Sequence, residues 1–306
     1  MRRELIATLV QLADEDERVM LLTGDLGFAA VEPFAERFPD RFVNVGVAEQ
    51  NMVGVATGLA EAGFTPYVYS ISTFASMRPY EFIRNGPVLH ALPVRVIGIG
   101  EGVDYGHNGM THYALEDLAL MRTQPALTLV TPAASEQVEA LLRGVQPLPG
   151  PVYIRVSKQS VSIPELAGRF ELGRAHQITP GQDIAIVATG GVSEFALAAS
   201  RMLAEQNVAA GVTVVSCLNP APTADLIDLL DGVPVVITVE SHYITGGLGS
   251  LVAEVIAENS LRCRLVRAGV QSMPLGISGS REYMHDQLGL SPARLAETAR
   301  QLLVVG

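Results

Sequence analysis

Residues 45–56 read VGVAEQNMVGVA, and this stretch decides how the rest of the chain is interpreted. Three polar residues, Glu49, Gln50 and Asn51, stand among small and apolar ones. The small residues that follow allow close packing, and we expect a helix over residues 51–62. A carboxylate at the start of this helix has two interpretations. It stabilises the helix N-terminus, which the residue alone favours, or it is a buried carboxyl that can share a proton with a heterocyclic nitrogen.

Outward from this stretch, β-branched runs alternate with helical patterns along the whole chain. Strand–helix alternation with continuous apolar strands predicts parallel sheets that are covered by helices on both faces. In the first half we expect strands at residues 19–23, 65–69, 94–98, 127–131 and 152–156, and helices at 51–62, 79–90, 115–122 and 135–143. In the second half we expect strands at residues 184–189, 212–216 and 234–240, and helices at 194–205, 223–230 and 248–258.

A segment rich in proline and glycine interrupts this rhythm at residues 161–181. We interpret it as a linker between two doubly wound α/β domains, residues 1–160 and a smaller domain at residues 182–306. Ligands of open α/β sheets bind beyond the carboxyl ends of the strands. The residues that follow each strand are therefore the first candidates for a site.

Composition limits the class of partner. The net charge of -11 argues against nucleic acid and against an anionic membrane, because both require a positive surface. The two cysteines, Cys217 and Cys263, form neither a disulfide framework nor a metal-ligand pattern. The apolar stretch near the N-terminus is too short for a signal peptide, and no stretch has the length of a membrane span. We therefore expect a cytoplasmic protein.

Two further stretches follow predicted strands. Residues 65–74 read TPYVYSISTF, after which Phe74, Met77 and Tyr80 recur at a spacing that is typical of one buried helix face. Residues 98–112 read GIGEGVDYGHNGMTH. Their glycine spacing is not that of a dinucleotide-binding loop, and no helix follows immediately. The loop histidines, His107 and His112, remain as polar candidates.

The stretch VAEQNM at residues 47–52 resembles the glutamate motif of the transketolase family and of 1-deoxyxylulose-5-phosphate synthases. The resemblance implies that the cofactor is thiamine diphosphate and that Glu49 is catalytic, through a hydrogen bond to the aminopyrimidine ring. It implies that Phe74 stacks on this ring and that Tyr80 is a second aromatic of the pocket. Met77 stands where many transketolases have another aromatic, and it can still pack against a ring.

The stretch NGMTH at residues 108–112 resembles the substrate loop of the family. The resemblance implies that His112 is catalytic, because it contacts the donor oxygen and takes part in proton transfer. The substrate-binding residues that it implies are Asp25, His107, Asn108, His112 and Lys158. The chain departs from the family pattern at four positions, which are Asn108 for an aspartate, Ala29 for a serine, Gly100 for a histidine and Lys158 for an arginine. Lysine binds phosphate without the bidentate fork of arginine, so a substrate phosphate is held differently or is absent.

The resemblance covers the pyrimidine-binding and C-terminal domains of the family. Full-length transketolases also have an N-terminal domain that binds the diphosphate through Mg²⁺ with a Gly-Asp-Gly sequence, and no Gly-Asp-Gly occurs here. We predict no metal ligand in this chain. We expect a separate partner subunit that carries the diphosphate and Mg²⁺ site, in an α₂β₂ heterotetramer whose active sites lie between subunits. The chain is then active only with this partner.

The function that the resemblance implies is transfer of a two-carbon ketol unit from a ketose or ketose phosphate donor to an aldehyde acceptor. A first alternative is a specialised enzyme with an unphosphorylated or carrier-bound acceptor. A second is the β-type subunit of a 2-oxo acid dehydrogenase, which residues 50–52 and the Thr111-His112 pair disfavour. A third is a non-catalytic scaffold, against which the presence of Glu49, Phe74 and His112 counts.

Overall fold

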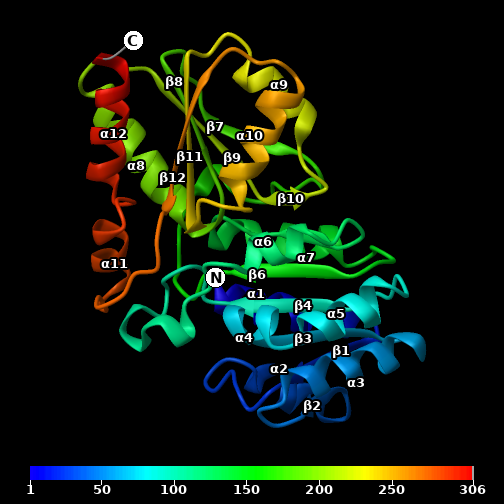
Figure 1. The fold of residues 1–306 in the computed structure, drawn as a ribbon. Coiled ribbons are helices and arrows are strands. Elements are labelled where there is room, and N and C mark those ends of the chain that lie inside the picture. Colours follow the sequence, from blue (N-terminus) through cyan, green and yellow to red (C-terminus); the bar gives the residue numbers. More distant parts are fainter. Residues whose placement is uncertain (305–306) are drawn as a thin grey trace.

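Two sheets with mostly parallel strands form the centre of the structure, a computed structural model that describes residues 1–304 (Figure 1). The first sheet has seven strands in the order β10-β5-β6-β4-β3-β1-β2, and the second has five in the order β12-β11-β8-β9-β7. Each sheet carries one antiparallel strand at its edge, β10 against β5 and β7 against β9. The prediction of an α/β fold with two domains and parallel-dominated sheets is confirmed.

The first domain contributes six strands and seven α-helices. The strands are β1 (Val19–Thr23), β2 (Phe42–Asn44), β3 (Thr65–Ile71), β4 (Arg95–Ile99), β5 (Thr128–Val130) and β6 (Val152–Val156). The α-helices are α1 (Arg2–Glu15), α2 (Glu32–Arg37), α3 (Glu49–Glu61), α4 (Ser72–Met77), α5 (Tyr80–Ile83), α6 (Asp117–Arg122) and α7 (Val138–Val145). One π-helical turn, Arg84–Val88, follows α5 directly.

The second domain contributes the remaining strands and helices. The strands are β7 (Ala175–Thr179), β8 (Ile184–Ala188), β9 (Ala210–Val215), β10 (Cys217–Asn219), β11 (Val235–Tyr243) and β12 (Arg264–Val270). The helices are α8 (Ser193–Ala204), α9 (Thr223–Leu230), α10 (Leu248–Glu258), α11 (Arg281–Gln287) and α12 (Pro292–Val304).

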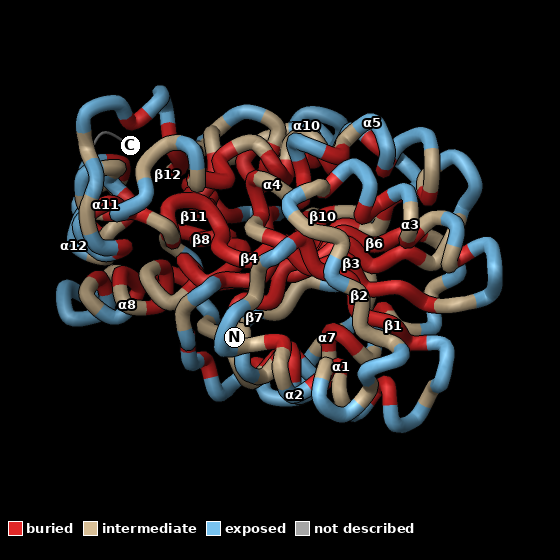
Figure 2. The backbone as a smooth tube through the Cα atoms, turned by 90° about the horizontal axis from the view of Figure 1, so that it is seen from below, coloured by how far each residue is buried: buried red, intermediate tan, exposed pale blue. Residues whose placement is uncertain are grey.

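The two faces of each sheet are buried under different helices. Successive strand residues point to opposite faces, so Leu21 packs with α1 and α7 on one side while Leu22 packs with α3 and α6 on the other. In the second sheet, α8 and α12 cover one face, and α9 and α10 cover the other. Figure 2 shows the strands as a buried centre inside more exposed helices and loops. Both sheets are therefore continuous apolar layers, as their β-branched runs predict.

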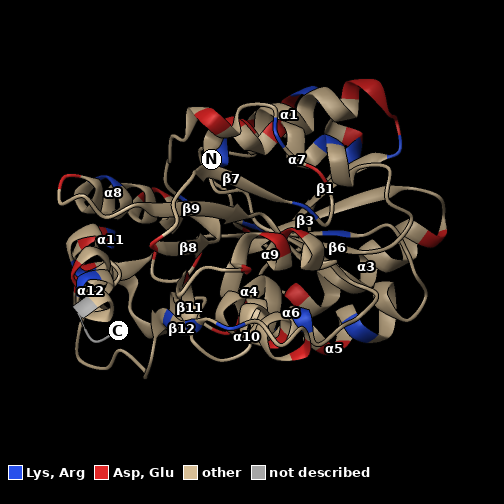
Figure 3. Ribbon diagram, turned by 90° about the horizontal axis from the view of Figure 1, so that it is seen from above, with Lys and Arg blue, Asp and Glu red and all other residues tan. Residues whose placement is uncertain are grey.

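Charged residues lie mainly on the helices and loops around the sheets (Figure 3). Two arginines are exceptions, because Arg95 on β4 and Arg155 on β6 are fully buried within strands. Arg155 donates to the carbonyl oxygens of Ala114 and Ser241, which ties the first domain to β11 of the second. None of the helices within the described chain combines the length and the apolar character that a bilayer crossing requires.

The helix expected over residues 79–90 is wrong in its extent. Helix α4 ends at Met77, α5 spans four residues, and a π-helical turn continues to Val88. Pro79 lies between α4 and α5, and Pro87 lacks the N–H that a regular helix needs there. Helix α6 begins at Asp117, two residues after its expected start, and α3 begins at Glu49.

Several elements were not expected from the sequence. Two of them are long helices, α1 and α12, and the others are α2, β2, β7, β10, β12 and α11. Strand β7 lies within residues 161–181, the segment interpreted as a linker, and pairs with β9. Strand β10 follows β9 in the second domain but pairs with β5 of the first sheet, because the chain crosses back over the domain junction. The domain boundaries at residues 160 and 182 stay a prediction.

Candidate active site

Glu49 is the first residue of α3 and its side chain is only 1% exposed. Gly46, with φ of 74°, turns the chain from β2 toward this helix, and Ala48 provides no side-chain cap. The carboxylate therefore lies at the positive end of the helix and inside the protein at the same time. Ser70 at the end of β3 donates to Oε1 over 3.4 Å. Glu49 is therefore both a carboxylate at a helix N-terminus and a buried carboxyl group, so the position is compatible with both interpretations of this residue.

Arg78 contacts both halves of the expected cofactor pocket. Its Nη1 donates to Glu49 Oε1 at 2.9 Å and to Oε2 at 2.8 Å. Its guanidinium carbon lies 3.8 Å from the centre of the Phe74 ring. Phe74 is on α4 and Arg78 follows that helix at a spacing of four residues, which places both on one face. The carboxylate and the ring therefore border one space, in which a flat group with N–H donors fits.

His112 lies against the other side of this space. Its ring centre is 5.3 Å from that of Phe74 in an edge-to-face arrangement, and 6.0 Å from that of Tyr105. The His112 Nδ1 and the Thr111 hydroxyl are 2.9 Å apart, so one ring nitrogen is held by its neighbour and the other stays free for a ligand. The structure thus brings Glu49, Phe74 and His112 to one place from α3, α4 and the loop between β4 and α6.

Tyr105 explains the glycine at position 100. Gly100 has φ of 84°, and a Cβ atom there would lie 2.1 Å from Tyr105 Cε2. The tyrosine ring therefore fills the volume that a side chain at this position would need. Lys158 Nζ lies 4.6 Å from the centre of the same ring, a cation–π contact. Tyr105 was missed by the sequence analysis, and no spacing signal points to it.

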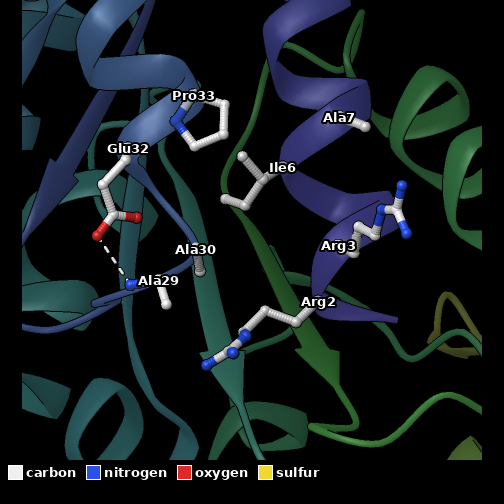
Figure 4. Close-up of a pocket in the computed structure, with 8 residues that line it drawn as sticks. All are labelled: Arg2, Arg3, Ile6, Ala7, Ala29, Ala30, Glu32 and Pro33. Atoms are coloured by element: carbon white, nitrogen blue, oxygen red, sulfur yellow. Dashed lines mark hydrogen bonds between the residues drawn. The ribbon is translucent and has the colours of Figure 1, made fainter.

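A pocket of about 620 Å³ opens between the first two turns of α1 and the segment that leads into α2 (Figure 4). Figure 4 shows the Arg2 side chain extending toward Ala29 and Ala30, while Arg3 points away from them. The Ala29 N–H donates to Glu32 Oε1 at 2.8 Å. Burial raises the pKa of Tyr69 and of Tyr105, and the positive charge of Arg2 opposes both rises. The Met1 amino group donates to the Gln159 carbonyl oxygen at 2.9 Å, so the start of α1 with Arg2 lies against the segment that carries Lys158.

The remaining candidate residues are more scattered. The Asp25 N–H donates to Asn44 Oδ1 at 3.0 Å, and Asn44 Nδ2 donates to Asp25 Oδ1 at 3.4 Å, so Asp25 joins the ends of β1 and β2. His107 and Asn108 are exposed in the same loop as His112. Met77 is 46% exposed beside Phe74. The Tyr80 hydroxyl lies 2.6 Å from Thr123 Oγ1, so it points to the end of α6 rather than toward Glu49.

The side chains around Glu49 and Phe74 match the aminopyrimidine part of thiamine diphosphate. The Arg78 guanidinium is planar, carries N–H groups, donates to Glu49 and stacks on Phe74. An aminopyrimidine ring is also planar, can stack on Phe74 and can form a hydrogen bond with the Glu49 carboxyl group, so the residues present fit that part of the cofactor. For Mg²⁺, no group of three or more His, Cys, Asp or Glu side chains within residues 1–304 is placed to hold a metal ion.

Two family profiles match most of the sequence. Residues 1–164 match the transketolase pyrimidine-binding domain, and residues 173–295 match the transketolase C-terminal domain. A putative transketolase C-terminal section from Methanocaldococcus jannaschii is 35% identical over 301 residues, which cover 97% of this chain and 94% of that protein. A 6-deoxy-6-sulfo-D-fructose transketolase subunit from Clostridium sp. (strain MSTE9) is 33% identical over 304 residues, 99% of this chain and 94% of that protein.

A solved structure is similar over the whole length. It is described as a split gene transketolase, an inactive β4 tetramer, and it superposes with a TM-score of 0.90 at 33% sequence identity. The match covers 99% of this chain and 98% of that chain. Sequence and structure therefore agree on the same two-domain unit.

Proposed function

Because this chain belongs to the transketolase family, we propose that it supplies the pyrimidine-binding half of a two-subunit, thiamine-diphosphate-dependent transketolase. The observation that carries the proposal is the shared space between the buried Glu49 carboxylate and the Phe74 ring. Bound there, thiamine diphosphate supplies the nucleophilic carbon that accepts a two-carbon ketol unit from a ketose and passes it to an aldehyde.

Glu49 and Phe74 bind and activate the pyrimidine ring. Phe74 offers one ring face for stacking, which fixes the plane of the cofactor. Glu49 offers a carboxylate at the edge of that plane, where it shares a proton with a ring nitrogen. Its burial excludes water from this contact, which strengthens the hydrogen bond. Met77 lies one helical turn after Phe74 and borders the same pocket. The Tyr80 hydroxyl contacts Thr123, which fixes the tyrosine ring next to the end of α6.

His112 acts on the substrate in this proposal. Its contact with Thr111 orients the ring, and the free ring nitrogen accepts or returns a proton at a donor hydroxyl or carbonyl oxygen. His107 and Asn108 extend the same loop and bind sugar hydroxyls, and Asp25 does so from the end of β1. The position of these side chains on loops at the carboxyl ends of β1 and β4 supports these roles.

Lys158 and Arg2 bind an anionic end of the substrate. The Lys158 ammonium lies on Tyr105, and the Met1 amino group, next to Arg2, donates to the Gln159 carbonyl oxygen, next to Lys158. Two neighbouring cations favour a phosphate or a sulfonate group. The relative from Clostridium is named for a sulfo sugar, which supports an anionic substrate for this chain. A specialised enzyme with an unphosphorylated acceptor remains the second candidate, because Ala29 offers no polar side chain.

A partner subunit completes the active site. The relatives that match over nearly their whole length are named as a section or a subunit of transketolase, and one is described as an inactive β4 tetramer. We propose that this chain is likewise inactive alone and that an N-terminal-half subunit brings the diphosphate and Mg²⁺ site, in a cytoplasmic α₂β₂ heterotetramer. The transketolase names of these relatives disfavour a 2-oxo acid dehydrogenase.

The test is a calorimetric titration of thiamine diphosphate with Mg²⁺, first into this chain alone and then into the complex isolated through a tag on this chain. We expect no saturable binding to the lone chain and 1:1 binding per chain in the complex. Tight binding to the lone chain would refute the two-subunit site. Release of CO₂ from pyruvate by the complex, without ketol transfer, would favour the dehydrogenase instead.

A further inference from the structure

One side chain, Arg78, contacts both the carboxylate and the aromatic ring of the proposed pyrimidine site. The Arg78 guanidinium donates to both oxygens of Glu49 at 2.8 Å and 2.9 Å, and its central carbon lies 3.8 Å above the Phe74 ring. A distance of 3.8 Å is a van der Waals contact, so no second flat group fits between Arg78 and Phe74. In this arrangement a cofactor ring cannot stack on the face of Phe74 that Arg78 covers, which is the face beside Glu49.

We propose that Arg78 is a placeholder for the aminopyrimidine ring, and that cofactor binding displaces it from Glu49 and Phe74. The inference rests on the proposed function, because it takes thiamine diphosphate as the ligand. Ring and guanidinium share a flat π surface that stacks on Phe74, and each places a nitrogen atom against the Glu49 carboxyl group. Their binding to the site is therefore mutually exclusive.

The geometry also gives the reason for a placeholder. The Glu49 side chain is 1% exposed, and a buried carboxylate without a counter-charge is costly. Arg78 supplies that charge in the cofactor-free chain and keeps the carboxylate and the ring in the positions that the cofactor requires. Its own side chain is 40% exposed and sits after the last residue of α4, so it can turn into solvent without unfolding a helix.

The exchange changes the charge next to Glu49. When the guanidinium leaves, a fixed positive charge leaves with it, and the carboxylate becomes free to share a proton with the ring nitrogen that replaces it. Arg78 is therefore a positioning residue that acts before the cofactor arrives. Only chains in which Arg78 has left the site can bind the cofactor. The apparent affinity is therefore the intrinsic affinity multiplied by the fraction of such chains.

The first test measures cofactor affinity by calorimetry in the tagged complex, for the wild type, Arg78→Gln and the control Arg37→Gln. Arg37 pairs with Asp14 on the surface, so the control removes the same charge from an exposed pair. We expect Arg78→Gln to bind thiamine diphosphate about tenfold more tightly, which corresponds to ~1.4 kcal/mol, and Arg37→Gln to bind as the wild type does. Equal or weaker binding by Arg78→Gln would overturn the placeholder while the proposed function stands. No binding to any complex would overturn the proposed function itself.

The second test uses the lone chain and no cofactor. Urea unfolding of Arg78→Gln, Glu49→Gln and the double variant forms a double-mutant cycle. We expect Arg78→Gln to lower the unfolding midpoint, and the double variant to recover most of that loss, because Glu49→Gln removes the charge that Arg78 neutralises. Additive effects of the two substitutions would show that the pair does not form, which would overturn the proposal.

Discussion

Asp104 and Arg281 join the loop between β4 and α6 to the second domain through a buried ion pair, with 3.1 Å between Asp104 Oδ1 and Arg281 Nε. The other Asp104 oxygen accepts hydrogen bonds from the Ser157 hydroxyl and from the Lys158 N–H, both at 2.8 Å. Arg281 also donates to Glu194 at the start of α8, at 2.7 Å. One arginine of α11 therefore holds the segment that presents Lys158.

Replacing Arg281 by methionine should destabilise the chain by about 3 kcal/mol, because the substitution leaves a buried Asp104 carboxylate without its partner. Urea unfolding of the lone chain measures this loss. The matched control is Arg300→Gln, since Arg300 pairs with Glu297 between side chains that are both well exposed. The control should change the free energy of unfolding by less than about 1 kcal/mol. Equal losses in the two variants would contradict a special role for the buried pair.

Glu101 should give the folding stability a distinct pH dependence. Burial, with a smaller effect of the Asp104 charge, raises its pKa from 4.5 to about 7, against the opposing effects of Arg155 and Arg281. The folded state therefore holds this proton more tightly than the unfolded chain does. The stability that Glu101 contributes is complete below pH 4.5 and is lost as the pH rises through about 7. The loss is at most about 3 kcal/mol.

The measurement is the difference in unfolding free energy between the wild type and Glu101→Gln, taken from pH 4.5 to pH 8. Two buried histidines act in the opposite direction, because burial lowers the pKa of His242 to about 4 and of His285 to about 3. Their stabilising effect is lost as the pH falls, so the wild-type curve alone mixes both contributions. The wild type should lose stability relative to Glu101→Gln as the pH rises. A constant difference over this range would rule out a raised pKa for Glu101.

Periodicity and composition predict the centres of the two sheets and most of the helices that cover them, but they miss the sheet edges and the covering helices α1 and α12. The strands of the two sheet centres follow from continuous apolar runs such as residues 65–71 and 184–188. Strands β2 and β10 span three residues each, which is too short for a period to appear. Strand β10 also exists only because the chain returns to the first sheet, and that is a tertiary event that no local pattern encodes.

Some residues of the candidate site could be predicted from the sequence and others could not. Glu49, Phe74 and His112 meet in space, and each stands in a stretch that the sequence analysis had selected. Arg78 was missed although its spacing of four residues from Phe74 is a readable helical signal. Tyr105 and Arg2 had no such signal, because their position depends on how the loop after β4 and the start of α1 contact the segment that carries Lys158.

Glu49→Gln tests the catalytic assignment with little change in shape. We expect the ketol-transfer activity of the complex to fall by about 100-fold or more, because the amide cannot take up the proton that a carboxylate shares with the ring. The control is Glu61→Gln at the exposed end of the same helix, which should retain full activity. Both variants should fold, which circular dichroism of the lone chains checks. Full activity of Glu49→Gln would support the scaffold alternative for this subunit.

Lys158 is the only lysine in the sequence, and its replacement tests the anionic-substrate site. Lys158→Met removes the ammonium group that lies over the Tyr105 ring, while it keeps an apolar side chain of similar length. For a phosphorylated or sulfonated substrate we expect KM to rise about tenfold with kcat within about twofold, since the contact is remote from the reacting carbon. Lys158→Arg should keep the charge and recover most of the affinity. Steady-state kinetics with a phosphorylated aldehyde and its unphosphorylated analogue separate the two substrate classes. If Lys158→Met raises KM equally for both, the side chain orders the loop and does not bind an anion, and the unphosphorylated acceptor becomes the better candidate.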